Sequence, residues 1–252
     1  MRWRVAGASV VGTSHVAQGT ACQDDCWASC EVINGEPFVL LVAADGAGSA
    51  ALGGEGAELI VRTAVAFFEE RLSRDDARLD HALASDCAAV VRERLGEEAA
   101  ARGAVVRDLA ATFVAVLGSS TGTLAIQIGD GAAVVDVGDG LVVPTEPMNG
   151  DYANTTRFLT DADAPAHLAV VLFDRPLVRA AVFTDGIQRL ALRLSTNTAH
   201  EPFLNPLFET LAATPTERED ELTPALDAYL ASAAVNERTD DDKTLLLALA
   251  VG

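Results

Sequence analysis

Apolar residues along the first half of the chain follow two different periods, and each period predicts a different kind of element. Runs at 3–11, 26–33 and 38–44 are short and largely apolar, which predicts β-strands. The glycine-rich segment 45–54 follows as a turn. Beyond it, apolar residues recur at spacings of three and four, first over 55–74 and again over 79–95, so we expect two amphipathic helices.

In the second half of the chain, as in the first, predicted strands are grouped together and predicted helices are grouped together. Residues 109–143 consist of short β-like runs separated by Gly, Ser and Asp turns, a pattern typical of a meander. Runs at 168–173, 178–184 and 244–251 predict three more strands. Residues 186–233 are predicted to be helical, with interruptions at prolines 202, 206, 215 and 224. Because strands and helices come in blocks, we expect an α+β fold with antiparallel sheets and outer helices, in one domain over residues 1–252.

Charge restricts the partners of this chain. It carries 18 basic and 37 acidic residues, for a net charge of −19. Such a field repels nucleic acids and anionic membrane surfaces, so neither is expected as a partner, and it attracts divalent cations. The sequence has no apolar stretch of the ~18 residues that a membrane span requires, and its start lacks the features of a signal peptide. We therefore expect a cytoplasmic protein.

The chain has four cysteines, at positions 22, 26, 30 and 87. The first three are spaced four residues apart, which places them on one face of a strand. The sequence has no C-x-x-C pair and no closely spaced histidine pair after them, which are the usual signs of a structural zinc site. We expect ordinary reduced thiols.

Aspartates recur at the ends of the apolar strands, within 23–25, 44–46, 129–131, 184–186 and 240–242. A carboxylate at a strand end extends from a rigid frame, and carboxylate oxygens are the ligands that Mg²⁺ and Mn²⁺ prefer. An Asp-Gly pair is also a common turn, and glycine allows the backbone to turn sharply. From the residues alone, both a set of turns and a shared metal site remain open.

Six segments, taken in order, resemble the PPM (type 2C) metal-dependent protein phosphatases, and in particular their compact bacterial branch. The resemblance extends over nearly the whole chain. It implies a four-layer α/β/β/α sandwich, with two antiparallel sheets flanked by helix pairs and metal ions at one end between the sheets. The segments are GTSHVAQGTACQDD, VAADGAGSA, AATFVAVL, IQIGDGA, VFTDGI and DDKTLLLAL.

The resemblance also implies roles for particular residues. Asp24 corresponds to the acidic residue of the first motif, which holds the metals partly through water. Asp45 corresponds to the carboxylate that bridges two ions, and Gly46 to the residue whose carbonyl binds one of them. Asp185 and Asp241 correspond to the remaining ligands.

Two details of this ligand set depend on alignment. Asp130 lies where the family has an aspartate associated with a weaker third metal, although a hairpin turn is the alternative. In the last motif, the family pattern Asp-Asn-x-Thr selects Asp241. A slip of one residue would select Asp240 instead, and Asp242 takes the position of the Asn.

The implied activity is hydrolysis of phosphoserine or phosphothreonine on a protein substrate, by a metal-activated water at a binuclear Mn²⁺ or Mg²⁺ centre. We expect a monomer that acts on a phosphoprotein and opposes a cognate Ser/Thr kinase. Two alternatives remain. One is a catalytically silent member of the fold that binds a phosphoprotein, and the other is a two-metal hydrolase of small phosphoesters.

The chain departs from the family pattern at two positions. Gly19 stands where the family often has an arginine that contacts phosphate, and Ala47 stands where eukaryotic members have a histidine, a proposed proton donor. His15, Arg4 and Arg157 are candidates to replace the arginine. Arg157 lies in the polar segment 148–160, a candidate flap on the substrate side or a solvated loop.

Overall fold

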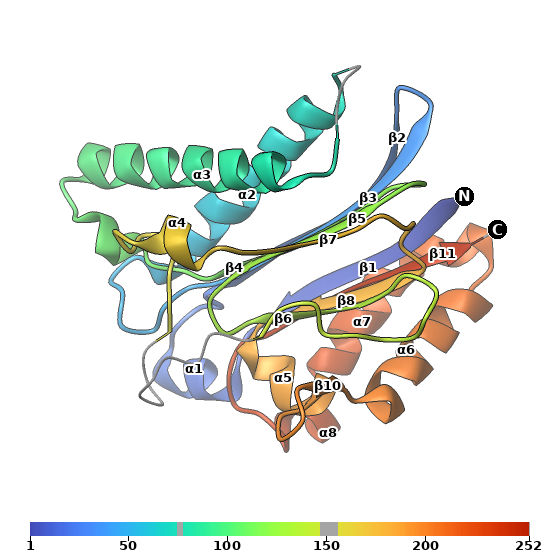
Figure 1. Cartoon of the computed structure of the whole chain (residues 1–252). Helices are drawn as coiled ribbons and strands as arrows, with labels where there is room; N and C mark the ends of the chain where they lie inside the picture. The colour runs from blue at the N-terminus through green and yellow to red at the C-terminus, as the bar shows by residue number, and fades with distance from the viewer. Residues whose placement is uncertain (75–77, 147–155, 252) are drawn as a thin grey trace.

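Two antiparallel β-sheets lie face to face in the computed structural model, with helices on both outer faces (Figure 1). The structure describes residues 1–74, 78–146 and 156–251. This arrangement confirms the α+β class and the four-layer α/β/β/α sandwich.

The first sheet has five strands in the order β2-β3-β4-β5-β7, and its outer face is covered by two long helices, α2 and α3. Strand β3 is buried on both sides. Leu40, Val42 and Ala44 belong to the cluster packed under the helices, whereas Val39 and Leu41 face the space between the sheets. This two-sided burial explains the nearly continuous apolar run. The elements are β2 (Asp24–Ile33), β3 (Glu36–Asp45), β4 (Phe113–Gly118), β5 (Thr123–Ile128), β7 (Ala169–Phe173), α2 (Gly53–Leu72) and α3 (His81–Arg102).

The second sheet has four strands in the order β1-β11-β8-β6, so strands from near the two chain ends are paired. Its outer face packs against helices from the C-terminal third of the chain, through a separate apolar cluster. The elements are β1 (Arg2–Val10), β6 (Ala132–Asp136), β8 (Arg179–Phe183), β11 (Lys243–Val251), α5 (Asp185–Ala191), α6 (Glu201–Ala213), α7 (Leu222–Leu230) and α8 (Ala233–Asn236).

Several shorter elements connect these layers. They are α1 (Thr13–Gln18), the 3₁₀ helix η1 (Val106–Leu109), α4 (Ala164–His167), the strand pair β9 (Leu192–Arg193) and β10 (Thr198–Ala199), and the 3₁₀ helix η2 (Thr216–Glu221). Among the described residues, no helix combines the length and apolar character that a membrane span needs.

Several predictions about local structure were wrong. Residues 192–199, expected as part of a helical region, carry the strand pair β9 and β10, and α7 continues through Pro224, where an interruption was expected. The run 141–145, expected as β-like, makes only an isolated bridge between Val142 and Val135, and it contains Pro144, which has no N–H to donate. Helix α6 continues through Pro206, where an interruption was expected. Pro206 lies six residues into the helix, so only one backbone hydrogen bond, to the carbonyl of Pro202, is lost.

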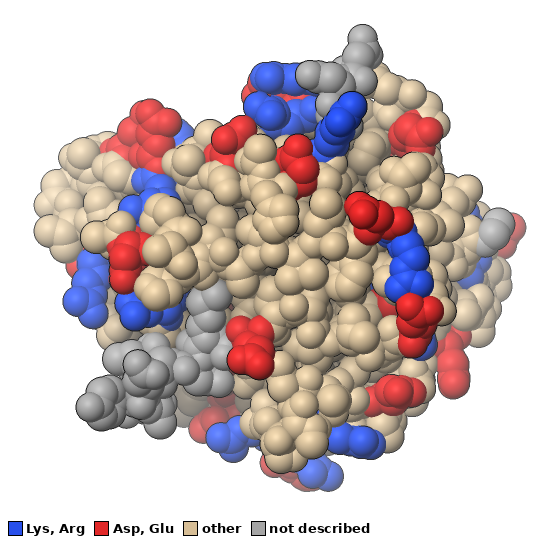
Figure 2. All heavy atoms as spheres, viewed as in Figure 1, with Lys and Arg blue, Asp and Glu red and all other residues tan. Residues whose placement is uncertain are grey.

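All the predicted aspartate segments meet at one end of the sandwich, beside α1 and the first turn of α5 (Figure 1). Asp24 begins β2 and Asp45 ends the antiparallel neighbour β3, so both lie at the same edge. Charge is unevenly spread on the face seen in Figure 2, where uncharged atoms occupy the middle and charged side chains lie mostly around it. The net charge of −19 is therefore not spread evenly over this face.

Candidate metal centre

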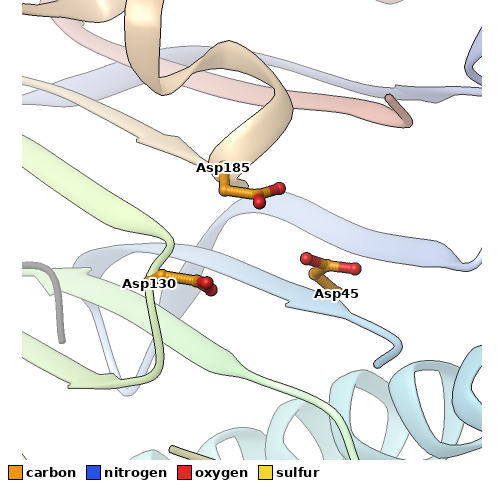
Figure 3. A group of neighbouring side chains, drawn as sticks. All are labelled: Asp45, Asp130 and Asp185. Carbon is orange, nitrogen blue, oxygen red and sulfur yellow. The ribbon is translucent and has the colours of Figure 1, made fainter. Parts of the chain in front are cut away.

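Three carboxylates from distant parts of the chain converge at this end of the sandwich (Figure 3). Asp45 ends β3, Asp130 lies in the turn between β5 and β6, and Asp185 is the first residue of α5. One carboxylate oxygen from each lies within 4.8 Å of the others. This group is the one cluster of three or more potential metal ligands within the residues that the structure describes.

Neighbouring polar groups set the positions of these three aspartates. The backbone N–H of Thr112 donates to the Asp45 carbonyl (2.8 Å), and the Asp45 N–H donates to Thr112 Oγ1 (3.0 Å). Gln188 Nε2 donates to the Asp130 carbonyl (2.7 Å), and Gln188 belongs to α5, the helix that Asp185 begins. Gln188 thus links the Asp130 segment to the helix of Asp185, and Thr112 ties Asp45 to the segment before β4.

Glycine follows all three of these aspartates, and at Gly46 and Gly186 the backbone is packed too closely for a side chain. A Cβ at Gly46 would lie 2.3 Å from the carbonyl carbon of Gly53, and one at Gly186 would lie 1.9 Å from the carbonyl oxygen of Asp242. Neither glycine has a positive φ. The sequence argument that these glycines allow a sharp turn was therefore wrong in its reason, since close packing requires them.

The cluster opens into a pocket of about 360 Å³. Asp241 and Gly46 line it together with the three clustered aspartates, so five of the predicted metal-binding residues share one cavity. The full lining is His15, Gln23, Asp45, Gly46, Ala47, Gly48, Ser49, Arg107, Thr112, Asp130, Thr156, Phe158, Asp185 and Asp241.

The electrostatics of the cluster favour a bound cation. Burial raises the pKa of Asp45 well above its usual range, and the negative charges of Asp24, Asp185, Asp130 and Asp241 raise it further. Burial, followed by Asp130 and Asp241, raises the pKa of Asp185 to about 7. These carboxylates repel one another as anions, and a divalent cation between them would remove that cost.

An unsatisfied oxygen gives independent support for a ligand. Asp130 Oδ2 accepts a hydrogen bond from Thr156 Oγ1 (2.6 Å). Its Oδ1 is buried and has no hydrogen-bond partner among the described residues. A buried carboxylate oxygen normally has a partner, and hard oxygen donors are what Mn²⁺ and Mg²⁺ bind. The donor set therefore fits the divalent metals that the sequence predicted.

Asp24 lies behind this cluster and does not join it. Its Oδ2 accepts hydrogen bonds from the hydroxyls of Thr244 (2.7 Å) and Thr184 (2.8 Å). Burial raises the pKa of Asp24 to about 7, against the lowering effect of these two hydroxyls. Asp24 is the register partner of Asp45, so the two residues lie side by side at the ends of their strands.

The three consecutive aspartates before β11 have three different environments. Asp240 and Asp241 are both exposed, but only Asp241 lines the pocket, whereas the backbone carbonyl of Asp240 accepts from the N–H (2.9 Å) and the hydroxyl (2.7 Å) of Ser14. The buried carboxylate of Asp242 accepts from the backbone N–H groups of Gly12 and Gln23, at 2.6 Å each. Of these three aspartates, Asp241 alone lines the pocket that holds the carboxylate cluster.

The candidates for phosphate contact are dispersed. His15 lines the pocket, with its Nδ1 2.9 Å from Asp242 Oδ2. Arg4 is paired with Glu219 (2.7 Å) on the helical side of the second sheet. Gly19 caps the end of α1 at a φ of 71°, and no atom lies within 4 Å of a Cβ placed there.

Arg157 is directed away from the pocket lining. Its Nη1 lies 3.4 Å from Asp163 Oδ2, and its side chain is partly exposed. Residues 148–155 of the proposed flap lie outside the described residues, whereas Thr156 and Phe158 line the pocket.

Sequence reasoning missed several polar residues that support the site. Thr112, Thr184 and Thr244 each lie in a segment that the resemblance used, and each holds an aspartate or its backbone. Only Thr184 stands directly beside a motif aspartate, Asp185, so it alone carried a local sequence signal. Arg107, which lines the pocket from η1, had no such signal. The four cysteines are free thiols, and none belongs to the carboxylate cluster.

The chain is similar to known protein phosphatases in sequence, and it shares its fold with solved structures. The family model for protein phosphatase 2C matches residues 11–230. Serine/threonine-protein phosphatase 3 of Escherichia coli (strain K12) is 46% identical over 250 residues, which are 99% of this chain and 99% of that relative.

Solved structures share the fold at low sequence identity. The catalytic domain of the serine threonine protein phosphatase PstP, in complex with 2 manganese ions, has a TM-score of 0.67 at 17% identity and covers 100% of this chain and 99% of its own. PppA, a regulatory component of the T6SS in Pseudomonas aeruginosa, has a TM-score of 0.66 at 18% identity, with the same coverage of 100% and 99%.

Proposed function

The chain belongs to the protein phosphatase 2C family and is a metal-dependent serine/threonine protein phosphatase, and we propose that Asp45, Asp130, Asp185 and Asp241 hold its divalent cations. The observation that carries this assignment is the convergence of three carboxylates, within 4.8 Å, around a buried oxygen that has no partner among the described residues. Gly46, whose backbone lines the same pocket, is proposed to contribute its carbonyl.

The proposal includes two ions, Mn²⁺ or Mg²⁺, with Asp45 as the ligand common to both. Its support is the location of Asp45, whose pKa is raised by charges on several sides, from Asp24, Asp185, Asp130 and Asp241. Asp130 is proposed to serve a weaker third ion. The structurally similar PstP contains two manganese ions, which agrees with this number.

The chain's own residues hold this centre in place for hydrolysis. When bound, divalent cations lower the pKa of water and neutralise charge on a phosphoryl group. Thr112 fixes the backbone of Asp45 through both its N–H and its hydroxyl. Asp24, which Thr184 and Thr244 hold in place, stands next to Asp45, and we propose that it acts on the metals through water and through the position of Asp45.

No cysteine is among the described residues that line the pocket, and the one serine there, Ser49, makes no hydrogen bond to His15 or another base within the described residues, so the proposal assigns no protein nucleophile. Ala47 presents no proton donor where the second motif has a histidine in eukaryotic members. His15, held beside Asp242, is proposed as a weak contact to the substrate phosphate.

The substrate is proposed to be a phosphoprotein. The Escherichia coli relative is a serine/threonine-protein phosphatase and matches this chain over 99% of its length. A cognate Ser/Thr kinase, a cytoplasmic location and a monomeric state belong to the same proposal.

Hydrolysis of a phosphothreonine peptide, measured with Mn²⁺ and with EDTA, tests this function. We expect release of phosphate with Mn²⁺ and none with EDTA. A nucleotide or other small phosphoester, offered at the same concentration, should be hydrolysed more slowly. Peptide binding without release would instead support the catalytically silent alternative, and a preference for the small phosphoester would support the small-molecule hydrolase.

A further inference from the structure

Arg107 is the one arginine or lysine among the residues described as lining the metal pocket. Gly19, where the family often has a phosphate-contacting arginine, supplies no side chain, and Arg4 and Arg157 are paired with acids elsewhere. We propose that Arg107 binds the phosphate group of the phosphoserine or phosphothreonine substrate. This inference rests on the proposed function.

The position of Arg107 relative to Asp45 is fixed by backbone contacts. Its 3₁₀ helix, η1, is hydrogen-bonded to the loop that follows Asp45. The N–H of Leu52 donates to the Asp108 carbonyl (2.8 Å), and the N–H of Ala47 donates to the Ala110 carbonyl (2.9 Å). The segment then continues directly to Thr112, which holds Asp45. Arg107 therefore lies on a segment whose backbone is hydrogen-bonded to the loop that follows Asp45.

Packing under η1 allows little movement. Leu109 is fully buried, and a Cβ at Gly56 of α2 would lie 2.2 Å from the Leu109 carbonyl oxygen. Helix α2 and η1 are thus in contact through their backbones. Because Arg107 is exposed and the segment that carries it is anchored at Leu109, its guanidinium can adjust to a ligand while its backbone stays in place.

The guanidinium of Arg107 is available for an anion. It takes part in no ion pair and donates no hydrogen bond within the described part of the chain, unlike Arg102 in the neighbouring helix α3, which lies 2.6 Å from Glu98. A phosphoryl group that enters a pocket of clustered carboxylates meets a repulsive field, and a cation at the rim offsets part of it. Arginine also matches phosphate oxygens with two parallel hydrogen bonds, which a lysine cannot reproduce.

The same chemistry applies to the inorganic phosphate that hydrolysis releases. Arg107 should therefore bind both the substrate phosphate and free phosphate, so product inhibition reports on the same contact. This gives a measurement of Arg107 that does not depend on turnover.

The test compares Arg107→Ala and Arg107→Lys with Arg189→Ala as a matched control. Arg189 is an exposed arginine on α5, makes no ion pair among the described residues and does not line the pocket. For Arg107→Ala we expect KM for a phosphothreonine peptide to rise ~10-fold or more, because a charge-assisted bidentate contact is lost. Arg107→Lys should lie between the wild type and Arg107→Ala, and Arg189→Ala should match the wild type.

Two further readouts separate this role from a structural one. Binding of inorganic phosphate to the Mn²⁺-loaded protein, followed by thermal shift, should weaken in Arg107→Ala by a similar factor. Binding of Mn²⁺ itself, followed by calorimetry, should be unchanged. If the wild type fails to hydrolyse the peptide, the proposed function fails, while phosphate binding still tests Arg107.

Three results would overturn the inference. The first is equal KM and equal phosphate binding in Arg107→Ala and Arg189→Ala. The second is a loss of Mn²⁺ binding in Arg107→Ala in parallel with activity, which would make Arg107 a structural residue. The third is a rise in KM for His15→Ala with none for Arg107→Ala, which would place the phosphate beside α1 instead.

Discussion

Asp24 and Asp45 are register partners on β2 and β3, yet Asp45 points into the carboxylate cluster and Asp24 is held by two threonine hydroxyls. Two buried acids side by side are costly unless their charges are satisfied. The hydroxyls of Thr184 and Thr244 offset part of this cost for Asp24, and we propose that metal ions offset it for Asp45. The two aspartates should therefore respond differently to mutation.

Thr244→Val tests the support of Asp24. The valine keeps the shape of the side chain but removes the hydroxyl that donates to Asp24 Oδ2 at 2.7 Å. We expect the free energy of unfolding to fall by about 1.5–3 kcal/mol at pH 8, because the lost hydrogen bond serves a charged group. Denaturant unfolding measures this quantity.

Thr123→Val is the matched control for that variant. Thr123 is also buried, but its hydroxyl donates to a neutral backbone carbonyl, that of Arg175, at 3.0 Å. Its loss should cost only about 0.5–1.5 kcal/mol. Equal losses in the two variants would show that the charge on Asp24 has no special effect on this hydrogen bond.

The run of three aspartates before β11 should give three different phenotypes on replacement by alanine. Asp240→Ala should be silent, because that side chain is exposed and does not line the pocket. Asp241→Ala should weaken Mn²⁺ binding and leave stability intact. Asp242→Ala removes the acceptor of two backbone N–H groups, those of Gly12 and Gln23, and should destabilise the fold by about 2–4 kcal/mol.

Calorimetry with Mn²⁺ and denaturant unfolding, applied to all three variants, distinguish these effects. Loss of Mn²⁺ binding in Asp240→Ala with none in Asp241→Ala would shift the proposed ligand by one residue. An unchanged stability of Asp242→Ala would contradict its role in joining the N-terminal segment to the last strand.

The metal-free protein should lose stability as the pH rises. The folded-state pKa values of Asp24 and Asp185 are raised to about 7 from 3.8, so between these values the folded chain binds more protons than the unfolded chain. Stability therefore falls with increasing pH across this window and is lowest above about pH 7. We expect the melting temperature of EDTA-treated protein to be lower at pH 8 than at pH 5.5.

Mn²⁺ should reverse this loss, and more strongly at pH 8, because the ligands bind metal in their deprotonated form. Asp185→Asn should reduce the pH dependence of the metal-free protein, since it removes one of the buried carboxylates whose pKa is raised. A metal-free melting temperature that rises from pH 5.5 to pH 8 would show that these carboxylates are not destabilised by their surroundings.

The cysteines near the first motif should be dispensable for catalysis. Burial raises the pKa of Cys26 to about 11 and also raises the pKa of Cys22, so neither is a reactive thiolate at neutral pH. Replacing Cys22, Cys26 and Cys30 together by serine should leave Mn²⁺-dependent hydrolysis within a few-fold of the wild type. Stoichiometric zinc in the purified wild type that is absent from the triple variant would indicate a structural metal site instead.

The sequence predicted those parts of the fold that depend on local patterns. The apolar run that becomes β3 and the two helices α2 and α3 could be recognised, because burial on one or both faces imposes a clear period. Helix α1 could not, since it has six residues and none of them is buried. Its place depends on contacts with the segment at Asp240, more than 200 residues later.

The candidate site likewise contains some residues that local sequence motifs predict and others that they do not. Asp45, Asp130, Asp185 and Asp241 stand in short motifs at strand ends, so their convergence could be expected. The role of Asp242 could not, because its partner Gly12 is 230 residues away. Arg107 could not be predicted either. Backbone hydrogen bonds of η1 place it at the pocket, and such bonds leave no pattern in the sequence.

The most direct test of the metal centre is the kcat/KM of Asp45→Asn for a phosphothreonine peptide at saturating Mn²⁺. Asp227→Asn, which makes the same chemical change on an exposed position of α7, is the control. The account predicts that Asp45→Asn loses ~10³-fold or more of kcat/KM with its fold intact, because charge stabilisation by the metals is worth several kcal/mol. An Asp45→Asn variant that keeps about a tenth of the wild-type kcat/KM would contradict the assignment of Asp45 as the ligand common to both ions.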